Sequence, residues 1–195
     1  AASDVYKRQP MTPSGEIAWH EFIQLIAWHK LSGTNGIVIG GTTGERATLT
    51  ERELTQLIIT AVHNAGDTMA VIANTGCYST AATINRTKTA AELGAQAALV
   101  VTPYYNKPTE LGLYQHYSSV AQASAIPIIL YNVPSRTACD LKPDLVIRLA
   151  QLPNVIGIKE ASGDISRVTT ILTGCPQDFV IYSGYDERNL AMMQA

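Results

Sequence analysis

The chain has 195 residues, of which 46% are hydrophobic and 15% are charged, a composition that fits one globular domain with a substantial core. A net charge of −2 and an isoelectric point near 6.1 provide no basic surface for nucleic acid or anionic lipid. No apolar run reaches the roughly 18 residues of a membrane span. We therefore expect neither a nucleic-acid partner nor a membrane partner.

Short apolar runs recur along the chain at intervals of about 30 residues, which is the length of one βαβ unit. Because these runs are nearly continuous and do not alternate with polar residues, they predict strands buried on both faces, as in a parallel sheet. The predicted strands cover residues 37–39, 69–73, 98–101, 127–130, 155–158 and 179–182.

Helix patterns with recognisable starts lie between these runs. Thr50 and Glu53 form a capping box before an apolar face, and Ser79 or Thr80 opens an alanine-rich segment. Pro143 is placed to begin a further helix. The alternation of strands and helices favours a (β/α) barrel or a doubly wound sheet.

The strand ends separate these two folds. Neither the G-x-G-x-x-G of a dinucleotide fold nor the G-x-x-x-x-G-K-[ST] of a P-loop occurs in the chain. Polar or aromatic residues follow nearly every predicted strand instead, and a TIM barrel builds its active site from such strand ends. These segments are residues 40–45, 74–76, 102–106, 131–137, 159–160 and 183–184.

Lys159 is the most informative strand-end residue, because it terminates the apolar run 155–158. In a pocket of low dielectric constant the pKa of an amine falls, and the neutral amine can attack a carbonyl carbon to form a Schiff base. The alternative is a strand-end lysine whose ammonium group reaches water.

Cysteine and histidine spacing gives no sign of a metal site. The cysteines are odd in number and lack a C-x-x-C pair, so neither a disulfide framework nor a zinc site is predicted, and a reducing cytoplasm fits best. The histidines show no metal-binding spacing and are interpreted as ordinary residues of helix faces. These residues are Cys77, Cys139, Cys175, His20, His29, His63 and His116.

Four of the strand-end motifs resemble those of the pyruvate-dependent class I aldolases. They are GTTGE at 41–45, YYNKP at 104–108, YNVPSRT at 131–137 and IGIKEA at 156–161. Their order and spacing are most similar to the dihydrodipicolinate synthase family, over about residues 10–195. The resemblance implies a TIM (β/α)8 barrel and a lyase of lysine and diaminopimelate biosynthesis. Such an enzyme condenses pyruvate with L-aspartate 4-semialdehyde to 4-hydroxy-tetrahydrodipicolinate, with a covalent imine in place of a cofactor.

The resemblance also implies roles for four catalytic residues. Lys159 would form the imine with pyruvate, and Tyr131 would act beside it as acid and base. Tyr131 would be hydrogen-bonded to Thr42, and Tyr105 would complete a proton relay to solvent. In the family the residue at this tyrosine position reaches into the site of a neighbouring subunit, so a homodimer or homotetramer is implied; the plain alternative is an aromatic pair, Tyr104 and Tyr105, at an interface.

Three further residues are implied in substrate binding. Thr43 and the backbone of the glycine-rich turn would hold the pyruvate carboxylate, since glycines let the backbone approach an anion closely. Arg136 would bind the carboxylate of the aldehyde substrate, and Gly184 would place backbone near the imine lysine. The alternative for Arg136 is a surface ion pair.

The chain departs from the family pattern at both ends. Residues 1–9 are polar where the family has an apolar first strand, so we expect an atypical or foreign segment there. Residues 10–195 would form a partial barrel without the eighth strand and the C-terminal helical region, because a full barrel has about 250 residues. Two other functions stay open: another pyruvate-dependent aldolase or dehydratase, and a catalytically inactive partial barrel.

Overall fold

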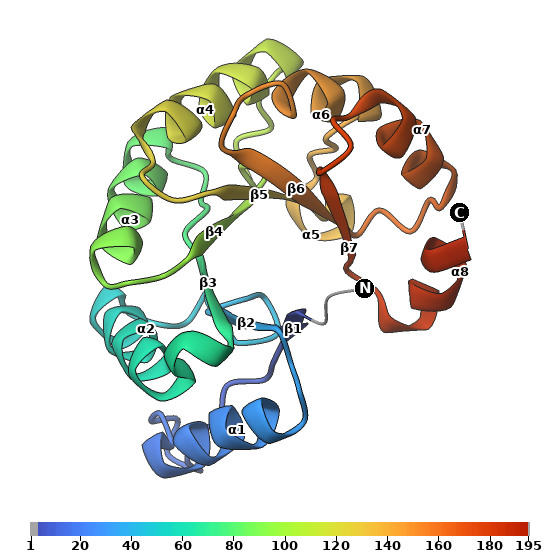
Figure 1. Ribbon diagram of the computed structural model, residues 1–195. Helices are drawn as coiled ribbons and strands as arrows, with labels where there is room; N and C mark the ends of the chain where they lie inside the picture. The colour runs from blue at the N-terminus through green and yellow to red at the C-terminus, as the bar shows by residue number, and fades with distance from the viewer. Residues whose placement is uncertain (1–3, 195) are drawn as a thin grey trace. The chain divides into compact units, whose positions relative to one another are not determined.

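The computed structural model describes residues 4–194 and divides into two compact units, whose elements are labelled in Figure 1. Unit 1 holds the described residues up to Asn74 together with Thr89–Ala98. Unit 2 holds Thr75–Lys88 and the chain from Leu99 onward. Helix α3 (Thr80–Glu92) and strand β4 (Ala97–Val101) each have residues in both units.

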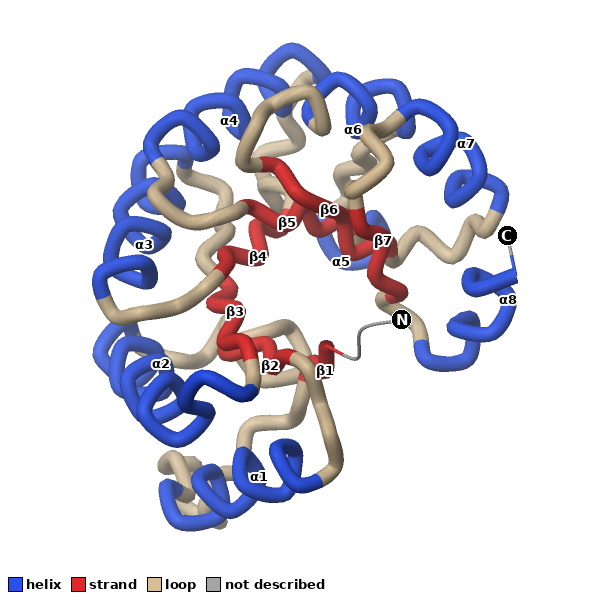
Figure 2. Tube along the Cα trace, in the orientation of Figure 1, coloured by secondary structure: helices blue, strands red, loops and turns tan. Residues whose placement is uncertain are grey.

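Unit 1 is a parallel sheet with helices beside it (Figure 2). Gly36 of β2 is in register with Asp4 of β1 on one side and with Ala70 of β3 on the other. Helix α2 packs against α1 and against both β2 and β3. The elements are β1 (Asp4–Tyr6), α1 (Trp19–Leu31), β2 (Gly36–Ile39), α2 (Glu51–Ala65), the 3-10 turn η1 (Gly66–Thr68) and β3 (Ala70–Asn74).

The start of α2 confirms the predicted capping box. The Thr50 side chain accepts a hydrogen bond from the Glu53 N–H at 3.2 Å, and the Glu53 carboxylate accepts one from the Thr50 N–H at 2.8 Å. The hydrogen bonds that the Thr50 N–H and the Thr50 hydroxyl donate to the Glu53 carboxylate hold the pKa of Glu53 below its usual value. Two backbone donors at the helix start are thereby satisfied by residues three positions apart, which is why the sequence alone could locate this helix start.

Unit 2 is also a parallel sheet, with helices α4, α6 and α7 along one side of its strands (Figure 1). Strand β6 lies between β5 and β7. Gly157 allows the close approach of β6 and β7, because a Cβ there would lie 2.5 Å from the Val180 carbonyl oxygen. The elements are α4 (Glu110–Ala123), β5 (Ile128–Asn132), α5 (Pro134–Thr137), α6 (Pro143–Leu149), β6 (Val155–Glu160), α7 (Ser166–Gly174), β7 (Val180–Ser183), the 3-10 turn η2 (Asp186–Arg188) and α8 (Asn189–Gln194).

The predicted strands are confirmed within one or two residues at each end. Within each unit the order of strands in the sheet follows their order in the chain, β1-β2-β3 and β5-β6-β7. A doubly wound sheet would reverse its order at a switch point, so this order favours the barrel alternative. The N-terminal strand is an unexpected finding, since Asp4–Tyr6 pair with β2 although the sequence there is not an apolar run. The interpretation of residues 1–9 as foreign stays a prediction.

Two of the four histidines are buried in the helical layer. His116 on α4 is 4% exposed, and its Nδ1 lies 2.9 Å from the Thr80 hydroxyl oxygen. Its Nε2 is buried without a hydrogen-bond partner among residues 4–194. Burial lowers the pKa of His116 from 6.5 to about 4, because the charged ring would be poorly solvated there.

We expect His116 to make the protein sensitive to acid. Between pH 6.5 and pH 4 the unfolded chain binds a proton at this side chain and the folded chain does not, so stability falls as the pH falls. The loss between pH 7 and pH 5 is about 2 kcal/mol. The free energy of unfolding, measured in urea at both pH values, should lose this pH dependence in His116→Asn. Asparagine can still form a hydrogen bond with Thr80 but does not titrate. The exposed His63→Asn serves as the control; equal pH dependence in both variants would contradict the assignment.

Candidate active site

Lys159 lies near the carboxyl end of β6 and is buried, with 6% of its surface exposed. The strand continues to Glu160, two residues beyond the predicted end, so Lys159 is its penultimate residue. The reading of Lys159 as a side chain that reaches water is also wrong, because the residue is enclosed. An amine in this position is costly to keep charged.

The environment of Lys159 disfavours the charged form of its amine. Burial lowers the pKa of the Lys159 amine from 10.5 to about 8, and the nearby carboxylate of Asp186 acts in the opposite direction. At this pKa about a tenth of the amine is neutral at pH 7, far more than for a lysine in water. A neutral amine is the nucleophile required for Schiff-base formation.

Tyr131 lies beside Lys159 on the neighbouring strand. The two residues are register partners of β5 and β6, and the Lys159 Nζ is 4.7 Å from the centre of the Tyr131 ring. Tyr131 is itself buried, at 4% exposure. The structure therefore brings together two of the predicted catalytic residues, through strand pairing.

Tyr182 is a neighbour of Lys159 that the sequence analysis missed. It is the register partner of Lys159 on β7, so aromatic residues flank the lysine from both adjacent strands. In a parallel sheet, register partners point to the same face. The signal was present in the sequence, since Tyr182 is the last residue of the predicted strand 179–182, but register could not be assigned without the pairing.

Arg136 and Gly184 lie around the same end of unit 2. Arg136 is exposed and belongs to the short helix α5 directly after β5. The Ser135 and Tyr185 hydroxyl oxygens are 3.5 Å apart, which links α5 to the loop after β7. The Gly184 N–H donates to the Glu160 carbonyl at 2.8 Å, and a Cβ on Gly184 would lie 2.4 Å from the Ala161 Cβ. Glycine is therefore required at this close approach to the end of β6.

Tyr105 is exposed, unlike the buried Lys159 and Tyr131. Its surface is 91% exposed, and its φ of +75° is in the left-handed region that side chains rarely adopt. The preceding Tyr104 packs edge-on against Tyr78, with ring centres 5.4 Å apart. The loop thus holds one tyrosine against unit 2 and presents the other outward.

Thr42 and Thr43 belong to unit 1, in the turn that follows β2. The Glu45 N–H donates to the Thr42 carbonyl at 3.1 Å, and Asn74 Nδ2 donates to the Gly40 carbonyl at 2.7 Å, which braces the start of the turn. Both threonine side chains are exposed. Their expected contacts with Tyr131 and with a pyruvate carboxylate stay predictions.

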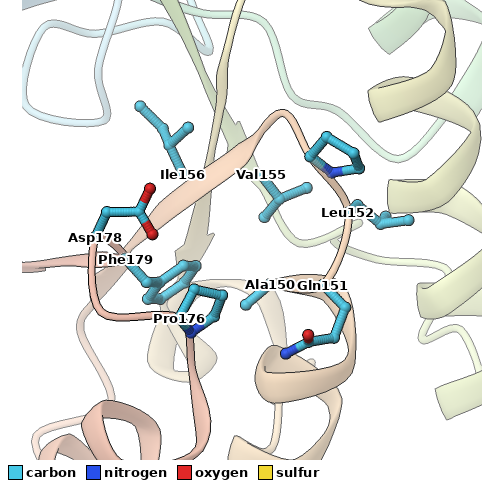
Figure 3. A pocket seen from close by; sticks show the side chains of 9 residues that line it. Ala150, Gln151, Leu152, Val155, Ile156, Pro176, Asp178 and Phe179 are labelled. Atoms are coloured by element: carbon cyan, nitrogen blue, oxygen red, sulfur yellow. The ribbon is translucent and has the colours of Figure 1, made fainter.

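A hollow of about 220 Å³ lies at the opposite end of β6 (Figure 3). Val155 and Ile156 begin the strand and line this hollow together with Phe179 and Asp178. Lys159 is not among its lining residues, so the hollow is separate from the candidate site. Within the part of the chain that the structure describes, no group of three or more His, Cys, Asp or Glu residues could hold a metal ion, and no helix is long and apolar enough to cross a membrane.

The lowered pKa of Lys159 predicts an unusual labelling profile. Because the neutral amine reacts, modification by acetic anhydride should be half-maximal near pH 8, as quantified by peptide mass spectrometry. The exposed Lys88 provides an internal reference in the same sample. Half-maximal labelling of Lys159 near pH 10.5 would contradict the assignment.

The parallel strands in chain order and the helices beside them define the class as a (β/α) barrel protein, with a buried lysine near the end of β6. The chain matches the dihydrodipicolinate synthetase family over residues 6–195 and belongs to that family. The expected fold class, an incomplete TIM barrel, is confirmed by solved structures of the family. The dihydrodipicolinate synthase of Acinetobacter baumannii, complexed with pyruvate, has a TM-score of 0.96 at 46% identity, and that of Aquifex aeolicus has 0.95 at 40%.

Curated relatives carry the same family identity. The 4-hydroxy-tetrahydrodipicolinate synthase of Nitrosospira multiformis is 50% identical over 184 residues, which are 94% of this chain and 61% of the relative. That of Stutzerimonas stutzeri is 47% identical over 193 residues, or 99% of this chain and 66% of the relative. The two solved structures are matched over 98% of this chain and 66% of theirs. The chain therefore spans slightly less than two thirds of the length of these relatives.

Proposed function

We propose that the protein containing this chain is a 4-hydroxy-tetrahydrodipicolinate synthase, which condenses pyruvate with L-aspartate 4-semialdehyde in lysine and diaminopimelate biosynthesis. The observation that carries the proposal is the buried Lys159 with a pKa of about 8, held 4.7 Å from the Tyr131 ring. Membership of the dihydrodipicolinate synthetase family supplies the choice of substrates.

In the proposed reaction the neutral Lys159 amine attacks the keto carbon of pyruvate and the carbonyl oxygen leaves as water. The resulting imine withdraws electrons, so a proton is lost from the methyl group and an enamine forms. The enamine carbon then attacks the aldehyde carbon of the second substrate. Tyr131 transfers the protons, and Thr42 and Tyr105 complete its proton relay. Finally, the amino group that came with the aldehyde substrate attacks the imine carbon and displaces the Lys159 amine, which closes the ring of the product.

The substrates are held by charge and backbone. Thr43 and the glycine-rich turn bind the pyruvate carboxylate, and Arg136 binds the carboxylate of the aldehyde substrate. The exposed position of Arg136 after β5 supports this role, because the second substrate enters from solvent. Gly184 supplies close backbone beside the imine lysine. The reaction uses the covalent imine and no separate cofactor.

A substrate panel tests the proposed function. The complete protein should turn over pyruvate with L-aspartate 4-semialdehyde faster than with other aldehydes. A preference for another aldehyde would indicate a different aldolase or dehydratase of the superfamily. If borohydride traps no imine with pyruvate, the result would favour the catalytically inactive barrel instead.

We also propose that the complete protein is a homodimer or homotetramer in which Tyr105 acts in the neighbouring site. Its 91% exposure and strained φ support a residue presented to a partner copy. Mixing inactive Tyr105→Phe subunits with inactive Lys159→Ala subunits should restore part of the activity, because mixed dimers contain one intact site. Activity that stays at the level of the separate variants would contradict a shared site.

Two further assignments remain proposals. We assign residues 1–9 to an atypical segment and residues 10–195 to a partial barrel, supported by the polar composition of the first nine residues. A cytoplasmic location is supported by the three free cysteines, of which Cys77 and Cys139 are buried.

A further inference from the structure

A buried polar network lies directly behind the Lys159 and Tyr131 pair. Asn132 and Glu160 are the next residues on β5 and β6 and are again register partners. Because successive residues of a strand point to opposite faces, their side chains lie on the other face of the sheet from Lys159 and Tyr131. Asn132 is fully buried, and Glu160 is 3% exposed.

The Asn132 side chain is fully engaged. Its Nδ2 donates to Asp140 at 3.1 Å and to both carboxyl oxygens of Glu160, at 3.3 and 3.2 Å. Its Oδ1 accepts the Leu141 N–H at 2.9 Å. One side chain thus connects β5, β6 and the segment between α5 and α6.

Glu160 and Asp140 extend the network to the next loop and helix. The Glu160 carboxyl group accepts the Ser162 N–H at 2.6 Å, which holds the chain just after Lys159. Asp140 is bound by both terminal nitrogens of Arg167 on α7, each at 2.7 Å. This pairing lowers the pKa of Asp140, so its carboxylate stays charged and bound.

Backbone hydrogen bonds connect the same strand ends. The Ala161 N–H donates to the Asn132 carbonyl, and the Gly184 N–H donates to the Glu160 carbonyl, each at 2.8 Å. Side chains and backbone therefore together hold the carboxyl ends of β5, β6 and β7 in register. That register is what sets the separation of Lys159 and Tyr131.

We propose that Asn132 and Glu160 are positioning residues, which hold the strand ends so that the Lys159 amine stays against the Tyr131 ring and away from water. This inference rests on the proposed function for its catalytic consequence. Tyr131 on β5, Tyr182 on β7 and the carboxylate of Asp186 are among the groups that face or act on the amine. Loss of the network changes how these groups surround the amine, without removing any of them.

The test compares Asn132→Ala with Asn154→Ala in the complete protein. Asn154 precedes the other end of β6, and its Nδ2 donates to the Ala121 carbonyl at 2.7 Å and to the Ser124 carbonyl at 3.4 Å. Both variants lose the side-chain hydrogen bonds of one asparagine that holds β6; Asn132 is buried and Asn154 is partly buried. Thermal unfolding first establishes the temperature range in which each variant is folded.

Two measurements are made in that range. The rate of borohydride trapping of pyruvate should fall roughly 10- to 100-fold in Asn132→Ala, as expected for a displaced reacting group. The pH midpoint of Lys159 acetylation should also move toward that of an ordinary lysine. Asn154→Ala should leave the rate within about twofold of the parent, because it holds the end of the strand away from the amine. Glu160→Gln retains an acceptor for the Ser162 N–H, so its effects should be smaller than those of Glu160→Ala.

The two readouts separate this inference from the proposed function. A folded Asn132→Ala with the parental trapping rate and acetylation curve would overturn the positioning role while the function stands. If the parent forms no imine but the acetylation curve still moves in Asn132→Ala, the proposed function fails and the positioning role stands. Should Asn132→Ala not fold, Glu160→Ala decides, because it removes the acceptor of both the Asn132 amide and the Ser162 N–H. A folded Glu160→Ala with the parental trapping rate and acetylation curve overturns the inference.

Discussion

Replacing Lys159 with alanine should abolish covalent trapping of pyruvate in the complete protein. Borohydride reduces an imine to a stable secondary amine, so the parent should gain the mass of one reduced pyruvate on the peptide that contains Lys159. Without this amine the covalent route is closed, and turnover should fall on the order of 10⁴-fold or more.

The controls for this experiment separate chemistry from packing. Lys159→Met keeps a long apolar side chain in the buried position but lacks the amine, so it should be as inactive as Lys159→Ala and more stable. Lys142→Ala removes a lysine at the start of α6 and should leave trapping unchanged. Pyruvate labelling that survives in Lys159→Ala would show that another amine forms the imine.

Replacing Tyr131 with phenylalanine should produce a different defect. In the parent the centre of the Tyr131 ring lies 4.7 Å from the Lys159 Nζ. The phenylalanine ring would keep this place, but the hydroxyl that carries the proton would be lost. General acid–base groups contribute about 10²- to 10⁴-fold, so turnover should fall by that factor while imine trapping is partly retained.

A matched tyrosine distinguishes this effect from a loss of stability. Tyr117 on α4 is fully buried, and its hydroxyl donates to the Val100 carbonyl at 3.1 Å. Tyr117→Phe should therefore lower the unfolding temperature with little effect on turnover. If Tyr131→Phe instead turned over at the parental rate, Tyr131 would have no part in the proton transfer.

Local signals explain which parts of the fold could be predicted. The capping box at Thr50 involves residues three positions apart, and each apolar run specifies its own strand. Strand ends were less certain: β3 includes Asn74, β5 includes Asn132 and β6 includes Glu160, all polar residues that were assigned to loops. Strand pairing extends the strands into these polar residues, and a hydrophobic run cannot indicate this.

Part of the candidate site was also accessible from the sequence. Lys159 could be singled out because a lysine after a buried run is unusual, and Tyr131 because it follows such a run in a motif similar to one of a known family. Their proximity follows from β5 and β6 being neighbours in register. Tyr182 was missed because its place beside Lys159 depends on the register of β7.

The sequence by itself determined the alternation of strands and helices and singled out Lys159, because both depend on residues that are close in the chain. The tertiary structure decided the burial of Lys159, which lowers its pKa, and the network behind it. Asn132 and Glu160 are 28 positions apart, and Asp140 and Arg167 are 27 apart. These four residues are polar, and their spacing in the sequence gives no sign that they are partners. They form hydrogen bonds because parallel strands bring distant segments to one edge of the sheet.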